Sequence, residues 1–216
     1  LRSLGARVNQ SQNSISVKPG NSLIPLAPYK IVSEMRASVC VLGPLLGRLG
    51  EAEVSFPGGC VIGPRPIDLH LKGLAALGAK ITIEHGYVKA RGNGLRGAEV
   101  YLGGPSGSSV LGTDNVMMAA ALAKGETVIE SGACEPEVVD LANFLVAMGA
   151  KIEGQGSHRI WIRGVKKLRG ARYRIIPDRI EAGTYLIAGA MTGGNVSVRT
   201  TLPEHHNALM DKLTQA

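Results

Sequence analysis

The sequence predicts an α/β protein assembled from a unit that recurs about every 70 residues. The string LGARV at residues 4–8 returns as LGAKI at 77–81 and as MGAKI at 148–152. The glycines of the three strings stand 73 and 71 residues apart. Because self-similarity at a fixed period is typical of repeat architectures, we expect the flanking elements to recur as well.

Each string is expected to end a helix and begin a β-hairpin. Apolar residues follow helical spacing over 69–77 and 139–148, and a glycine suited to a helix C-terminus follows each stretch. Two β-like runs separated by a polar turn come next, which predicts hairpins. These paired runs are 80–84 with 87–90 and 151–153 with 159–162.

A second helix and further strands complete the unit. Gly-Ala pairs at 97–98 and 170–171 lead into short strands, the second over 173–176. Later helices are expected over 33–49, 113–124 and 181–192, each followed by a strand, at 51–56, 126–130 and 195–199. The order is strand, helix, strand, helix, strand, strand, in which every helix can cover a sheet face. We expect a partial first domain over 1–176 and the start of a second over 177–216.

The composition favours a small anionic partner. There are 24 basic and 17 acidic residues, a formal net charge of +7. With two phenylalanines, five tyrosines, one tryptophan and scattered basic residues, nucleic-acid binding is the weaker interpretation. The longest apolar stretch, 39–46, contains Gly43 and Pro44 and is far shorter than the roughly 20 residues of a membrane span.

The cysteine pattern indicates the redox compartment of the protein, and the chain ends indicate whether the repeat pattern is complete. Cys40, Cys60 and Cys134 form no CxxC pair, so neither a disulfide framework nor a zinc site is predicted, and a reducing compartment fits. Residues 1–6 lack the apolar run of a signal peptide. The repeat pattern is cut at both ends, so we expect a truncated chain.

One glycine- and proline-rich loop, 56–69, departs from routine packing. Its glycines permit close approach to a ligand, and Pro66 suits the first turn of the helix that follows. The N–H groups of that helix and Arg65 would attract an anion and lower the pKa of the Cys60 thiol. The alternative is a small apolar cysteine under a tight turn, and the neighbouring glycines and Arg65 favour the reactive thiol.

The sequence PGGCVIGPRP at 57–66 resembles the enolpyruvyl transferases that act on UDP-N-acetylglucosamine. Further matching segments are MRAS at 35–38, EPE at 135–137 and PDRIE at 177–181. The resemblance implies an inside-out α/β barrel in each of two domains, every domain built from three similar units. It also implies transfer of the enolpyruvyl group of phosphoenolpyruvate to the sugar 3′-hydroxyl, the first committed step of peptidoglycan precursor synthesis. No metal or organic cofactor, no membrane and a cytoplasmic location are implied.

The resemblance also assigns roles to individual residues. Cys60 is implied to be the proton donor, to form an adduct with phosphoenolpyruvate and to be the target of fosfomycin. Arg36 and Arg65 are implied to line the anionic pocket. The residues implied to contact the nucleotide sugar are Arg65, Pro66, Ile67, Asp68 and Leu69, and those implied to hold its diphosphate are Ser108, Ser109 and Val110. Ordinary helix capping is the alternative for the serines.

Several other polar residues are expected to be structural. Glu135 and Glu137 precede a helix, as its dipole favours, and a role as acids in a cleft is the alternative. His70 is expected to be a packed histidine, and Cys40 and Cys134 buried fillers. By the resemblance, a Lys-Asn pair that binds phosphoenolpyruvate and a catalytic aspartate lie outside this sequence, so the piece alone is expected to be inactive. A noncatalytic nucleotide-sugar-binding paralogue remains the alternative.

Overall fold

The computed structural model describes residues 1–58, 66–105 and 107–216. Two compact units make up the chain, Leu1–Ala171 and Arg172–Ala216. The predicted thiol Cys60 and the predicted guanidinium Arg65 lie outside the described residues.

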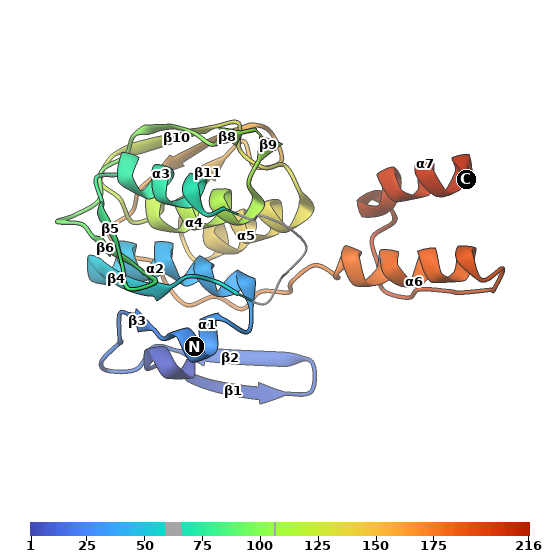
Figure 1. The fold of residues 1–216 in the computed structure, drawn as a ribbon, viewed down its shortest axis with the longest axis horizontal. Helices are drawn as coiled ribbons and strands as arrows, with labels where there is room; N and C mark the ends of the chain where they lie inside the picture. The colour runs from blue at the N-terminus through green and yellow to red at the C-terminus, as the bar shows by residue number, and fades with distance from the viewer. Residues whose placement is uncertain (59–65, 106) are drawn as a thin grey trace. The chain divides into compact units, whose positions relative to one another are not determined.

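The first unit contains strands and helices in alternation, as the α/β prediction requires (Figure 1). Its helical elements are η1 (Arg2–Leu4), α1 (Tyr29–Val32), η2 (Arg36–Val41), α2 (Leu42–Leu49), α3 (Asp68–Ala76), α4 (Val110–Ala120) and α5 (Pro136–Ala147). Its strands are β1 (Arg7–Ser11), β2 (Ser14–Lys18), β3 (Leu26–Ala27), β4 (Glu51–Ser55), β5 (Lys80–Glu84), β6 (Tyr87–Arg91), β7 (Glu99–Tyr101), β8 (Gly103–Gly104), β9 (Gly107–Ser108), β10 (Glu126–Glu130), β11 (Lys151–Glu153) and β12 (Arg159–Arg163).

Two four-stranded mixed sheets have the same connectivity. Their strand orders are β3-β4-β6-β5 and β7-β10-β12-β11. In each sheet the first pair is parallel and the other two pairs are antiparallel. The parallel pairs need crossover connections, which the intervening helices supply. The described residues also form the two-stranded ribbons β1-β2 and β8-β9.

Helix α4 lies among the other helices of this unit and is buried on nearly every side. It packs against α2, α3 and α5 (Figure 1). Val116, Met117, Ala119 and Ala120 are fully buried. Residues 116–120 are all apolar, so this part of α4 has no polar face for solvent and suits a central position. The strands pack one face inward, as in β12, where Ile160 and Ile162 are buried while Trp161 is half-exposed.

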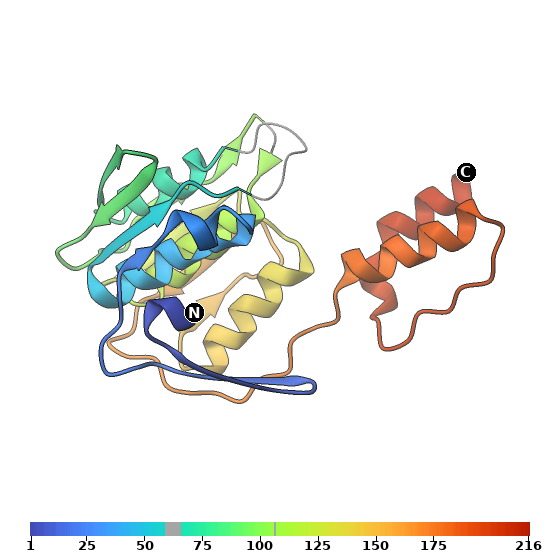
Figure 2. The ribbon, with the colours of Figure 1, turned by 60° about the horizontal axis from the view of Figure 1, so that its bottom comes forward.

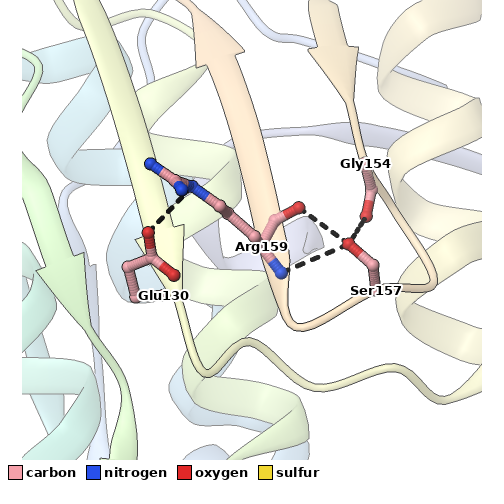
Figure 3. Close-up of polar contacts among 4 residues, drawn as sticks. All are labelled: Glu130, Gly154, Ser157 and Arg159. Atoms are coloured by element: carbon pink, nitrogen blue, oxygen red, sulfur yellow. Dashed lines mark hydrogen bonds and ion pairs between the residues drawn. The ribbon is translucent and has the colours of Figure 1, made fainter.

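The turn between β11 and β12 is held by side-chain hydrogen bonds (Figure 3). The Ser157 hydroxyl lies 2.8 Å from the carbonyl oxygen of Gly154 and 2.9 Å from that of Arg159, and it accepts from the Arg159 amide at 3.2 Å. The guanidinium of Arg159 pairs with the Glu130 carboxylate on β10 at 2.8 Å. These contacts fix the register of β12 against its neighbour.

The second unit is helical. Its elements are α6 (Arg179–Met191), η3 (Pro203–His206) and α7 (Asn207–Gln215), with α6 packed against the other two (Figure 2). The Asp178 carboxylate caps α6 by accepting from the amides of Ile180 and Glu181 at 2.8 and 3.0 Å. Capping therefore accounts for Asp178.

Some element predictions were wrong. The segments 173–176 and 195–199 are not strands, because no described strand pairs with them and an extended run needs a ladder partner. The helix predicted over 33–49 is divided: Met35 is extended, and a 3₁₀ segment precedes α2. Among the described residues, none of the helices has the length and apolar character to cross a membrane.

Candidate anion-binding site

A cavity of about 320 Å³ lies where the N-termini of α3 and α4 meet. It brings together seven residues that were predicted to bind substrate, Arg36, Pro66, Asp68, Leu69, Ser108, Ser109 and Val110. Five residues not predicted to bind substrate complete its lining, His70, Gly104, Pro105, Gly107 and Leu111. Ile67, the remaining described residue of the predicted set, is only 5% exposed and belongs to the hydrophobic core.

Arg36 supplies positive charge to the cavity. It is the first residue of η2, and its Nη2 donates to the carbonyl oxygen of Pro66 at 3.2 Å. This bond joins η2 to Pro66, the residue before the N-cap Ile67 of α3. A planar guanidinium suits phosphate and carboxylate oxygens, which it can bind with two parallel hydrogen bonds.

The two helix N-termini at the cavity differ in how their amides are satisfied. Helix α3 has Ile67 at its N-cap and no side-chain cap, with Asp68 in its first turn. Helix α4 is capped by Ser109, whose Oγ accepts from the Gly112 amide at 3.1 Å. The capping interpretation of Ser109 is thus confirmed. Free amides at a helix N-terminus, together with the helix dipole, favour a bound anion.

His70 is a packed histidine in the cavity wall, as expected. It is 1% exposed, and its Nδ1 lies 3.0 Å from Nδ2 of Asn115. Burial, and then the nearby charge of Arg36, lower its pKa to about 4, with Asp68 opposing the shift. His70 is therefore neutral at physiological pH.

Asp114 is a buried carboxylate that the sequence analysis missed. It is 8% exposed, and its Oδ1 has no hydrogen-bond partner among the described residues. Burial, and after it the charges of Glu137 and Glu135, together raise its pKa to about 7. Both glutamates lie at the N-terminus of α5, as predicted. The available indication was that Asp114 is the only charged residue in the helical stretch 110–120.

The two described cysteines are half-buried rather than fully buried fillers. Burial raises the pKa of Cys40 to about 12, with Asp114 adding to the rise and Arg36 opposing it. The Cys134 Sγ lies 3.4 Å from Nδ1 of His158, and burial, then Glu135, raise its pKa. Both thiols stay protonated at neutral pH, so neither is an activated nucleophile. Within the described ranges, no group of three or more potential metal ligands occurs.

The fold, with its mixed sheets and buried helices, is that of the enolpyruvyl transferases. The crystal structure of the enolpyruvyl transferase NikO from Streptomyces tendae matches with a TM-score of 0.73 at 22% identity, covering 87% of this chain and 44% of that one. An EPSP synthase from Acinetobacter baumannii matches with a TM-score of 0.62 at 22% identity, covering 88% and 43%.

Sequence comparison identifies the family. The family profile of EPSP synthase (3-phosphoshikimate 1-carboxyvinyltransferase) matches residues 1–216, and the chain belongs to this family. A UDP-N-acetylglucosamine 1-carboxyvinyltransferase from Methylacidiphilum infernorum is 54% identical over 213 residues. That alignment covers 99% of this chain and 50% of the relative, so the chain spans about half the length of the relative.

Proposed function

We propose that this chain is part of an enzyme that transfers the enolpyruvyl group of phosphoenolpyruvate to the 3′-hydroxyl of UDP-N-acetylglucosamine. The observation that carries the proposal is the cavity between α3 and α4, which gathers seven of the residues expected to bind substrate. The 54% identity to a UDP-N-acetylglucosamine 1-carboxyvinyltransferase supports the same substrate. The reaction would be the first committed step of peptidoglycan precursor synthesis, in the cytoplasm.

The diphosphate of the nucleotide sugar would occupy this cavity. The amides at the start of α3 and the guanidinium of Arg36 would donate to its oxygens, as would the hydroxyl of Ser108. Pro66, Asp68 and Leu69 would contact the nucleotide, with Ile67 beneath them in the core. Val110, the first residue of α4, would line the side of the cavity opposite these residues.

The chemistry would proceed by addition and elimination. The sugar 3′-hydroxyl gives its proton to a carboxylate base, the catalytic aspartate that the resemblance implies, and its oxygen bonds to C2 of phosphoenolpyruvate while Cys60 gives a proton to C3, which produces a tetrahedral intermediate. The C2–O bond to phosphate then breaks as C3 returns a proton to the Cys60 thiolate, and inorganic phosphate leaves. Arg36 and Arg65 would stabilise the developing negative charge. No step calls for a metal or an organic cofactor.

The architecture is proposed to be an inside-out α/β barrel built from units of about 70 residues. The shared connectivity of the two four-stranded sheets and the central position of α4 support this proposal. Residues 1–176 would form part of the first domain and residues 177–216 the start of the second. We also propose that this piece is inactive alone, and phosphate release by the purified chain would contradict that.

Mass spectrometry with fosfomycin tests the proposed site. The chain is incubated with fosfomycin, with and without UDP-N-acetylglucosamine, and peptides containing Cys40, Cys60 and Cys134 are mapped. A sugar-dependent adduct confined to Cys60, absent from Cys60→Ser, is expected. Equal labelling of the three thiols would contradict the proposal. Binding of the nucleotide sugar without any labelling would instead favour a noncatalytic binding protein.

A further inference from the structure

The side chain of Asn115, on α4, contacts residues of η2, α2 and α3. Its contact on α3 is His70, which lines the cavity. Asn115 is fully buried in α4. Its Oδ1 accepts from the amide of Gly43 on α2 at 2.5 Å. Its Nδ2 lies 3.0 Å from the carbonyl oxygen of Val39 and 3.0 Å from Nδ1 of His70 on α3.

The two backbone contacts determine which way the amide points. The Gly43 N–H can only donate, so it requires the oxygen of Asn115, and the Val39 carbonyl can only accept, so it requires the nitrogen. A flipped amide would place donor against donor at Gly43 and acceptor against acceptor at Val39. The orientation is therefore set by main-chain groups and does not depend on His70.

This orientation in turn determines the tautomer of His70. Because Nδ2 of Asn115 is a donor, Nδ1 of His70 must be an acceptor without a proton, and the proton of the neutral ring resides on Nε2. A Cβ built at Gly112 would lie 2.9 Å from Oγ of Ser109 and 3.7 Å from Cδ2 of His70. The ring edge that includes Cδ2 and its bonded neighbour Nε2 therefore faces the first turn of α4.

We propose that Asn115 is a positioning residue that holds His70 as the Nε2–H tautomer, and that this N–H donates to a phosphate oxygen of the ligand in the cavity. The choice of ligand rests on the proposed function, whereas the tautomer rests on the hydrogen bonds alone. The charged groups that act on the ring are Arg36 and Asp68. A neutral donor at this position adds a hydrogen bond without altering the charge of the cavity.

Nitrogen-15 NMR of the histidine rings tests the positioning role. We expect the His70 resonance, assigned by its loss in His70→Gln, to show a proton on Nε2 and no titration between pH 5 and 8. In Asn115→Asp the carboxylate still accepts from Gly43 but cannot donate, so His70 should acquire a proton on Nδ1 and a higher pKa. Asn143→Asp introduces the same charge at an exposed site on α5 and should leave His70 unchanged. A wild-type ring protonated on Nδ1 would refute the tautomer, even if Asn115→Asp does not fold.

Calorimetric titration with inorganic pyrophosphate and with UDP-N-acetylglucosamine tests the donor role. Loss of a hydrogen bond to a charged oxygen corresponds to about tenfold or more in affinity, which we expect for His70→Phe. His70→Gln places an N–H near the position of Nε2 and should recover part of that loss. Equal binding by wild type and His70→Phe would overturn the donor role alone. A wild-type chain that binds neither ligand would overturn the donor role together with the proposed function, while the tautomer is still decided by NMR.

Discussion

The helices α3 and α4 meet at the same cavity but begin in opposite ways. Helix α3 starts after Pro66 with no side-chain cap and with the exposed Asp68 in its first turn. Helix α4 starts with a Ser109 cap and carries Asp114 and Asn115 in the protein interior. Helix α3 therefore brings an N-terminus without a side-chain cap to the cavity proposed to bind an anion, whereas the first turn of α4 is capped by Ser109.

The largest effect is expected at Asp114, the buried aspartate of α4, and it depends on pH. Folding raises the pKa of Asp114 from 3.8 to about 7, so its contribution to stability is complete below about pH 4 and is lost as pH rises through about 7. At about 1.4 kcal/mol per pKa unit, this loss is about 4 kcal/mol. Asp114→Asn should remove most of this decrease in stability between pH 4 and 8.

Urea unfolding between pH 4 and 8 measures this effect. If the free energy of unfolding of Asp114→Asn varies with pH as it does in wild type, Asp114 is not the group whose protonation stabilises the fold.

The next largest effect concerns the contact that holds α4 against α2. A Cβ at Gly43 would lie 2.2 Å from the carbonyl oxygen of Asn115, a backbone atom that cannot move aside. Gly43→Ala should therefore destabilise the protein by about 3 kcal/mol. Gly47→Ala, one turn along α2, meets Ala119 only at 3.4 Å and should change stability by less than about 1 kcal/mol. Similar melting temperatures for the two variants would contradict the tight contact.

A smaller effect is expected at the cap of α4. Ser109→Ala removes the acceptor for the Gly112 amide, which should cost about 1 kcal/mol in thermal or urea unfolding. Ser108→Ala, a change at the adjacent residue outside the cap, should cost less than about 0.5 kcal/mol. If Ser109→Ala and Ser108→Ala lower the free energy of unfolding equally, capping of α4 does not account for the contribution of Ser109 to stability.

The smallest effect lies on the exposed face of α3. The Nζ of Lys72 is 5.2 Å from the ring centroid of Tyr101 on β7. Lys72→Met keeps the aliphatic stem but removes the charge, and the lost cation–π contact should lower stability by about 0.5 kcal/mol. Lys80→Met on β5 is the control for loss of an exposed lysine. An equal loss of stability in Lys80→Met would show that the change in net charge, and not the contact with Tyr101, causes the loss in Lys72→Met.

Local patterns predicted much of the first unit. The spacing of leucines placed α3, and the β-like run over residues 126–130 became β10 with the same bounds. The glycines after α3 and α5, Gly78 and Gly149, have φ values of 93° and 99°, as helix C-termini require. These features depend on neighbours in the chain, which the sequence shows directly.

Features that depend on distant contacts could not be predicted in the same way. The segment 195–199 has strand-like composition, but composition does not supply a pairing partner. The cavity residues of α3 and α4 were found through the resemblance, whereas Asn115 was overlooked because its role requires Gly43, Val39 and His70 to come together. An asparagine in a helical stretch has no distinguishing pattern until the fold buries it.

The central position of α4 has a consequence for local opening of the structure. Because α4 contacts α2, α3 and α5, its amides cannot reach solvent through fraying of any single neighbour. Hydrogen exchange along Val116–Ala120 should therefore require global unfolding of the first unit, whereas the β1-β2 ribbon, with Ile15 and Val17 exposed, should exchange through local openings. The helix that forms the cavity wall would then also be the most slowly exchanging part of this unit.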